Sequence, residues 1–159
     1  MLSFETLLSK NDVANEDILL SRIKKHLKEI KEGGVILDAG CGTGRFLNRI
    51  NSMTDKHVLV GFDLSAENIK IAKKATSNKE INFIVADIVA PPLMKECVSM
   101  ILVTNVFHHL RTIKESIHEL LALLNPSGIM LIDDKISGNP LYTICELAYN
   151  LMPLKYKMK

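Results

Sequence analysis

Three glycines at alternate positions follow an acidic residue, and this spacing predicts a ligand-binding turn. The apolar run Val35–Leu37 is expected to be a buried strand, and Asp38, Gly40, Gly42 and Gly44 come after it. Glycine has no Cβ, so it adopts positive φ freely and lets a ligand approach the backbone closely. The helix expected after the turn would point its free N–H groups at the same ligand. A strand, a glycine turn and a helix start are together typical of a nucleotide-binding site.

The spacing of the glycines and the charge of Asp38 indicate which ligand the turn binds. Dinucleotide-binding proteins favour G-x-G-x-x-G, whereas the pattern here is G-x-G-x-G. A carboxylate beside a pyrophosphate would be repelled, but beside a cationic group it is favourable. S-adenosylmethionine carries a sulfonium and an ammonium group and no phosphate, so it fits this turn. The alternatives are a plain tight turn and a structural or helix-capping role for Asp38.

Apolar runs alternate with amphipathic segments along most of the chain. We expect strands at 35–37, 57–62, 81–85, 98–103 and 129–132, and helices at 15–31, 45–51, 66–75 and 113–124. Thr112 and Glu115 form a capping-box pattern at the start of the last helix. Near-continuous apolar strands that alternate with amphipathic helices predict a doubly wound α/β domain with a parallel sheet covered on both faces.

A polar residue follows each of four successive strands. Asp38, Asp63, Asp87 and Asn105 occupy these positions. In open α/β sheets, ligands bind outside the carboxyl ends of the strands, where the strand order reverses. We therefore expect these four residues to surround one site, although Asp63 and Asp87 would also suit helix N-caps.

Composition indicates an ordinary folded domain and sets limits on its partners. The 159 residues are 47% hydrophobic and 24% charged, with a formal net charge of +2 and no basic stripe that would indicate a dedicated nucleic-acid surface. Cys41, Cys97 and Cys145 show no C-x-x-C spacing, which favours reduced thiols and a cytoplasmic location. The apolar segment 141–154 is too short to span a bilayer, and we expect no membrane span.

Residues 33–134 resemble the class I (Rossmann-like) S-adenosylmethionine-dependent methyltransferases. The glycine turn matches the family's first motif, 105–110 is similar to the fourth motif and its sequel in small-molecule methyltransferases, and 120–128 resembles the helix and turn before strand five. The resemblance implies a sheet with strand order 3-2-1-4-5, in which the expected strands are numbered along the chain. It also implies S-adenosylmethionine as the cofactor.

The resemblance also assigns a role to each residue of the expected cofactor site. The acid at 63 would hold the ribose diol, the acid at 87 would accept from the adenine amino group, and 64 and 88 would pack on the two sides of the adenine. The acid at 38 would bind the methionine ammonium, directly or through water, and the loop backbone at 39–42 with the main chain near 105 would frame the methionine part. The implied cofactor-binding residues are Asp38, Ala39, Gly40, Cys41, Gly42, Gly44, Asp63, Leu64, Asp87, Ile88 and Asn105.

Two adjacent histidines are the candidate catalytic residues. His108 and His109 follow Asn105 closely, and either could act as a general base if the methyl acceptor must lose a proton. A hydrogen-bonded structural pair is the alternative. The histidines could also be combined with Asp133 and Asp134 as metal ligands, but no motif spacing supports a metal site and none is expected.

The end of the chain departs from the family pattern. The family fold adds a sixth and a seventh strand, the last antiparallel, whereas 135–159 contain only a helix-like segment at about 140–152. We therefore expect a methyltransferase core with an N-terminal helix at 1–134 and a C-terminal helical segment of the same domain, truncated, at 135–159. Strand 129–132 would then be left as a sheet edge through which copies of the chain could associate.

The expected function is methyl transfer from S-adenosylmethionine to a small-molecule acceptor. The Asn-Pro-Pro-aromatic motif of amino-methylating nucleic-acid and protein-glutamine enzymes is absent after strand four, which favours a small acceptor. The alternatives are a non-catalytic S-adenosylmethionine-binding module, a partner subunit of an active methyltransferase, and an NAD(P)-dependent oxidoreductase. The sequence does not identify the methyl acceptor.

Overall fold

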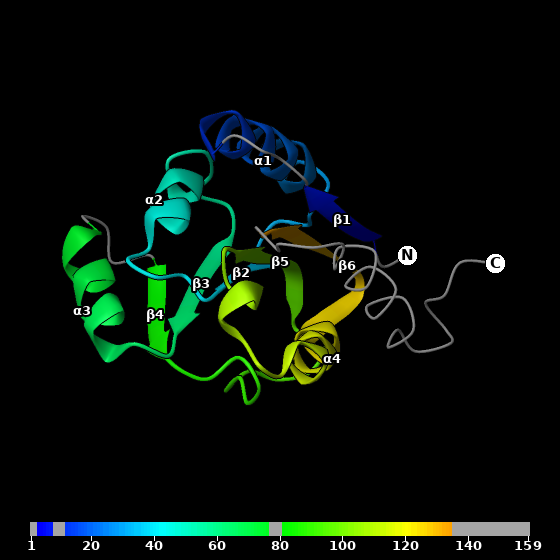
Figure 1. The fold of residues 1–159 in the computed structure, drawn as a ribbon. Helices are drawn as coiled ribbons and strands as arrows, with labels where there is room; N and C mark the ends of the chain where they lie inside the picture. The colour runs from blue at the N-terminus through cyan, green and yellow to red at the C-terminus, as the bar shows by residue number, and fades with distance from the viewer. Residues whose placement is uncertain (1–2, 8–11, 77–80, 135–159) are drawn as a thin grey trace.

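The computed structural model describes residues 3–7, 12–76 and 81–134, which form a six-stranded parallel sheet with helices on both faces (Figure 1). The strands pair in parallel throughout. Along the chain the elements are β1 (Ser3–Leu7), α1 (Asp12–Leu27), β2 (Val35–Ala39), α2 (Arg45–Asn51), β3 (Val58–Asp63), α3 (Ala66–Ala75), β4 (Ile81–Val85), β5 (Val98–Thr104), the short 3₁₀ helix η1 (Phe107–His109), α4 (Ile113–Leu123) and β6 (Leu124–Asp133).

The order of the strands across the sheet is β1-β6-β5-β2-β3-β4. The five strands expected from the sequence therefore lie in the order 3-2-1-4-5, as predicted. The chain adds β3 and β4 on one side of β2 and then crosses over to add β5 and β6 on the other. The switch point lies between β2 and β5, where a doubly wound sheet leaves a crevice for a ligand.

The first strand, β1, is not predicted by the sequence and corrects one expectation. It pairs with β6 in parallel from Ser3 opposite Ile129 to Leu7 opposite Asp133. The expectation that strand 129–132 is an open edge is therefore wrong, because β1 occupies its hydrogen-bonding groups. A homo-oligomer formed through this edge loses its basis for the same reason.

Two hydrophobic clusters, one on each face of the sheet, form the core. α1, α2 and α3 cover one face, where Ile23, Leu47 and Ile69 pack against side chains of the central strands. α4 and the loop after β4 cover the other face, with Leu120 and Ile88 in the cluster. Successive residues of one strand enter opposite clusters, as Ile36 and Leu37 of β2 do.

Helix α4 and strand β6 differ in detail from the sequence prediction. Thr112 precedes α4 but makes no side-chain capping bond; instead its carbonyl oxygen accepts a hydrogen bond from Ser116 Oγ at 2.9 Å. β6 begins directly after α4, and the predicted turn at 125–128 is an irregularity within the strand opposite Ser99. Proline in a parallel strand is tolerated at such irregular positions.

Residues 135–159 lie outside the described residues, so the boundary at 134, the helix-like segment at 140–152 and the missing strands six and seven stay predictions. Within the described ranges, no helix is both long enough and apolar enough to cross a bilayer.

Candidate functional site

A cavity of about 510 Å³ opens at the carboxyl ends of the central strands, beside the switch point of the sheet. The residues that follow β2, β3, β4 and β5 all contribute to it, and of the four strand-end polar residues Asp63, Asp87 and Asn105 lie in its lining. Its lining consists of Gly40, Cys41, Gly42, Thr43, Arg45, Phe46, Phe62, Asp63, Leu64, Asn68, Ala86, Asp87, Ile88, Thr104, Asn105, Val106, His109 and Leu110.

The glycine turn forms one wall of the cavity and is fixed to β3. The N–H groups of Gly40 and Cys41 donate to the carbonyl oxygen of Phe62, at 2.8 and 2.9 Å. Gly40 has a φ of 79°, and a Cβ there would lie 2.4 Å from Val106 Cγ2. Gly42 has a φ of 52°, but a Cβ there would meet no heavy atom within 4 Å. Gly40 is therefore required by packing, whereas Gly42 leaves bare peptide surface facing open space.

The Asp63 carboxylate joins the glycine turn to the start of α3. Its Oδ2 accepts from the Gly42 N–H at 2.9 Å, and its Oδ1 accepts from the Ser65 N–H at 2.9 Å and from Asn68 Nδ2 at 3.2 Å. Ser65, and not Asp63, caps α3, because Ser65 Oγ accepts from the Asn68 N–H. A carboxylate oxygen can accept two hydrogen bonds, so Oδ2 retains capacity for a ligand hydroxyl.

Asp38 is buried behind the glycine turn without a hydrogen-bond partner. It is 1% exposed, and neither carboxylate oxygen has a partner among the described residues. Burial, with the nearby negative charge of Asp63 as a second cause, raises the pKa of Asp38 to about 7. A structural acid would have its hydrogen bonds satisfied inside the protein. An unsatisfied buried carboxylate instead indicates that a cationic or donor group of a ligand completes the site.

Four further predicted residues line the cavity from β3, β4 and β5. Leu64 is 71% exposed, and Ile88 is buried in the core cluster beneath α4. Asp87 accepts from the Val89 N–H at 3.1 Å, and no helix follows it, so it is not a helix N-cap. Asn105 has a φ of 53°, a left-handed conformation, and its N–H donates to the Asp133 carbonyl oxygen at 2.8 Å.

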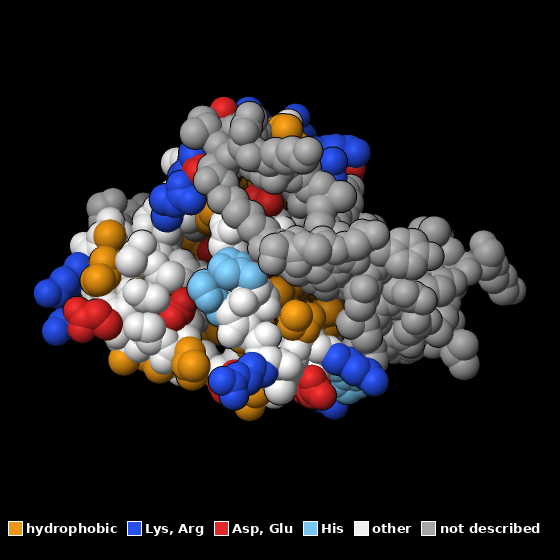
Figure 2. All heavy atoms as spheres, viewed as in Figure 1, with side chains coloured by type: hydrophobic (Ala, Val, Ile, Leu, Met, Phe, Trp, Pro, Cys, Tyr) orange, Lys and Arg blue, Asp and Glu red, His pale blue; other side chains and the backbone are white. Residues whose placement is uncertain are grey.

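The two histidines differ in their surroundings. His109 is exposed and lines the cavity. His108 Nδ1 lies 2.7 Å from Asp134 Oδ1, and the two imidazole centroids are 3.9 Å apart. Asp134 Oδ2 accepts from the N–H groups of Val106 and Phe107 at 2.7 and 2.6 Å. Asp134 therefore holds both η1 and the His108 ring, and histidine side chains lie together at the surface of the face in Figure 2.

The predicted residues thus divide between the cavity lining and its support. Asp38, Ala39, Gly44 and His108 are not in the lining that the described residues form. Ala39 is buried in the core, and a Cβ at position 44 would lie 2.6 Å from Phe83 Cζ. The described residues contain no group of three or more His, Cys, Asp or Glu that could hold a metal ion.

Several contributors escape prediction from the sequence. The sequence marks Asp134 only as a possible metal ligand, and nothing in the pair Asp133-Asp134 indicates which side chain turns inward. Asn68 occupies the fourth position of the S-x-x-N pattern that begins at Ser65, which could have identified it as part of the helix start. Arg45 and Thr104 carry a usable signal, because they adjoin the glycine turn and the fourth strand end.

A comparison with known families finds one matching family model. The model is described as a methyltransferase domain, and it matches residues 30–151, most of the chain.

Curated relatives match the chain over a large part of its length. A tRNA (carboxymethyluridine(34)-5-O)-methyltransferase of Arabidopsis thaliana is 34% identical over 114 residues, which is 70% of this chain and 26% of that protein. The chain spans about a quarter of the length of the first curated relatives it matches.

Solved structures share the fold at low sequence identity. A SAM-dependent methyltransferase of Aquifex aeolicus superposes with a TM-score of 0.66 at 22% identity, covering 89% of this chain and 88% of that one. A chain in the complex between the Haloferax volcanii Trm112 methyltransferase activator and a methyltransferase superposes with a TM-score of 0.58 at 20% identity, covering 76% of this chain and 59% of that one.

Proposed function

The chain belongs to the methyltransferase-domain family, whose model matches residues 30–151, and from that premise we propose that it transfers the methyl group of S-adenosylmethionine to an acceptor in tRNA. The 34% identity to a tRNA methyltransferase over 70% of the chain supports tRNA as the acceptor. A small-molecule acceptor, favoured by the fourth-motif region and by the low net charge, is the second candidate.

The residues of the cavity fit S-adenosylmethionine. Asp38 lies behind this lining, and a cationic ligand that binds it directly or through water would give its orphaned carboxylate a partner, because an unpaired buried carboxylate is costly. Asp63 is fixed by backbone donors and keeps acceptor capacity for ribose hydroxyls. Leu64 offers an exposed apolar surface at the cavity rim for the adenine, with Ile88 also in the lining. The open space at Gly42 lets a ligand approach the loop backbone.

The chain's own residues position the reactants. When bound, S-adenosylmethionine supplies a methyl group on a sulfonium, and the neutral thioether that remains after transfer is an excellent leaving group. The protein therefore mainly aligns the acceptor atom with the methyl group, and alignment of this kind contributes much of the rate in such reactions. The rigid attachment of the glycine turn to Phe62 and Asp63 keeps one side of the site fixed for this purpose.

The identity of the acceptor decides whether a base is needed. The relative's name specifies a carboxymethyl group, and carboxylic acids are ionised at neutral pH. With a carboxylate acceptor, His108 and His109 have no proton to remove, and we propose that a ring N–H of His109, which lines the cavity, positions the acceptor oxygen by hydrogen bonding. Asp134 then keeps the His108 ring in place through Nδ1.

A pH–rate profile separates positioning from base catalysis. At saturating cofactor and acceptor, positioning predicts a kcat that changes less than about twofold from pH 6 to 8.5. A kcat that rises with a pKa near that of histidine, and loses the rise in His108→Gln or His109→Gln, would assign a base instead.

Transfer of a labelled methyl group tests the proposed acceptor. The chain is incubated with methyl-tritiated S-adenosylmethionine and either total tRNA or a tRNA-free metabolite extract. The proposal predicts label in tRNA that ribonuclease releases and that mild alkali removes, because a methyl ester is saponified. Label in the metabolite fraction alone would establish the second candidate, and label in neither would reject methyl transfer by this chain.

A further inference from the structure

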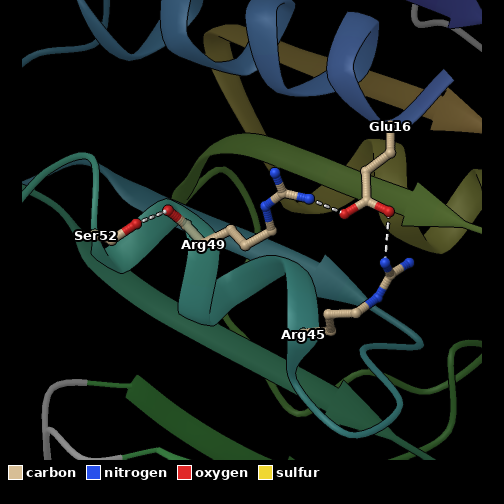
Figure 3. A network of polar contacts seen from close by, with 4 residues as sticks. All are labelled: Glu16, Arg45, Arg49 and Ser52. Atoms are coloured by element: carbon tan, nitrogen blue, oxygen red, sulfur yellow. Dashed lines mark hydrogen bonds and ion pairs between the residues drawn. The ribbon is translucent and has the colours of Figure 1, made fainter. Parts of the chain in front are cut away.

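A polar network beside the cavity joins α1 to α2. The Glu16 carboxylate lies between two guanidinium groups, with Oε2 bonded to Arg45 Nη1 and Oε1 bonded to Arg49 Nη1 (Figure 3). The Glu16 side chain is only 17% exposed, whereas those of Arg45 and Arg49 are 63% and 45% exposed. The acid is thus covered while the two cations remain open to solvent.

The network keeps Glu16 ionised. Burial alone would raise its pKa, but hydrogen bonds from Arg45 and Arg49, together with their positive charges, outweigh burial and lower the pKa. The carboxylate therefore stays negative over the physiological range of pH. Two arginines hold one anion.

The two arginines also line a groove that joins the cofactor cavity. The groove, of about 760 Å³, runs between α2 and α3, and Arg45 and Thr43 line both it and the cavity. Its other lining residues are Asn48, Arg49, Asn51, Ser52, Ile71 and Ala75. Within this lining the charged residues are Arg45 and Arg49, and the amides and hydroxyls beside them are common partners of phosphate oxygens. Basic side chains gather over α2 in Figure 2.

The position of Glu16 is one that a phosphate could take. Guanidinium groups bind carboxylate and phosphate through the same fork of N–H donors. The side chains of Arg45 and Arg49 are 63% and 45% exposed, so an incoming anion can reach both guanidinium groups. A bridging carboxylate that is exchanged for a phosphate leaves both arginines paired.

Resting on the proposed tRNA acceptor, we propose that Arg45 and Arg49 form a phosphate clamp for the substrate RNA, which Glu16 occupies in the free protein and a backbone phosphate takes over on binding. The clamp lies next to the cofactor cavity, so a phosphate held in the clamp would place the neighbouring nucleotides of the RNA at the mouth of that cavity. Glu16 acts as a competitor for the clamp. Its removal should therefore strengthen RNA binding, although it weakens the attachment of α1.

Binding of a fluorescein-labelled tRNA transcript, followed by anisotropy with saturating S-adenosylhomocysteine, tests the clamp. Glu16→Gln removes the competing charge and should tighten binding roughly fivefold. Arg49→Gln removes one phosphate partner and should weaken binding roughly fivefold, with a salt slope smaller by about 1. Lys114→Gln on α4, on the opposite face of the sheet, makes the same change of charge and should stay within about twofold of wild type.

The outcomes separate the clamp from a purely structural network. If Glu16→Gln lowers the melting temperature without tightening RNA binding, Glu16 only fastens α1 and the clamp is rejected. Arg49→Gln that binds and methylates tRNA like wild type, with an unchanged salt slope, rejects it as well and leaves the proposed function standing. A wild-type chain that binds no tRNA rejects both the clamp and the tRNA acceptor.

Discussion

Replacing the buried Asp38 by asparagine should stabilise the ligand-free protein at alkaline pH. The pKa of Asp38 rises from 3.8 to about 7 on folding, chiefly through burial and secondly through the charge of Asp63. Because the folded state holds this proton more tightly, it binds more protons than the unfolded state between these two pKa values. Stability contributed by the protonated carboxyl is therefore present at low pH and is lost as pH rises towards 7.

The size of the effect follows from the same values. Each pH unit in this window changes the free energy of unfolding by about 1.4 kcal/mol. From pH 5 to pH 8, wild type should lose about 3 kcal/mol at this residue, because the loss ends near pH 7. The amide of the Asp38→Asn variant has no proton to lose, so this variant should show none of the loss.

Urea unfolding followed by circular dichroism at pH 5, 6, 7 and 8 measures this difference. The stability of Asp38→Asn relative to wild type should grow by about 3 kcal/mol across the series. Asp55→Asn, at an exposed position with the same chemical change, should run parallel to wild type. If Asp38→Asn also runs parallel to wild type, Asp38 is not a buried, unpaired carboxylate and the reasoning fails.

Three further predictions concern the walls of the site. Gly40→Ala should destabilise the fold by about 2–4 kcal/mol through left-handed strain and the clash with Val106, as measured by chemical unfolding. Gly42→Ala should cost only about 1–2 kcal/mol of stability, yet weaken S-adenosylhomocysteine binding more than tenfold in calorimetry. Two variants with the same stability and the same affinity would contradict this. Asp134→Asn should lower stability by about 2 kcal/mol, or about 6 °C in melting temperature, because it weakens the hydrogen bonds from the Val106 and Phe107 N–H groups. His108→Gln should lower stability by less than about 1 kcal/mol. A larger loss in His108→Gln than in Asp134→Asn would refute the role of Asp134. Burial, and secondly the charges of Asp38 and Asp63, raise the pKa of the Cys41 thiol. Iodoacetamide at pH 8 should therefore modify Cys97 well before Cys41, as followed by peptide mass mapping. Faster modification of Cys41 than of Cys97 would contradict the burial of Cys41.

The sequence predicts the central sheet well because its signals are local. Strands that are almost wholly apolar, such as Val98–Thr104, are recognisable without partners. α2 and α3 span 45–51 and 66–75, the residues that the sequence predicts. The residues at the strand ends then follow from the general rule that parallel strands present their carboxyl ends at one edge. The cavity lining agrees with that rule at Asp63, Asp87 and Asn105.

Features that depend on contacts between distant parts of the chain escape the sequence. β1 is five residues long and pairs with a strand more than a hundred residues away, so no local periodicity marks it. Glu16 meets Arg45 and Arg49 across 29 and 33 residues, on helices whose relative position only the fold determines. The inward turn of Asp134 likewise depends on the backbone of η1, with which it pairs.

Calorimetry of the purified chain with S-adenosylhomocysteine and with NAD⁺ tests the central claim, that the cavity beside Asp38 and Asp63 is an S-adenosylmethionine site. We expect one S-adenosylhomocysteine site per chain and no heat from NAD⁺. Asp38→Asn should lose roughly 10- to 100-fold in affinity, as expected for a buried charged partner of the ligand ammonium. Binding of NAD⁺ in preference to S-adenosylhomocysteine, or wild-type affinity in Asp38→Asn, would contradict the claim.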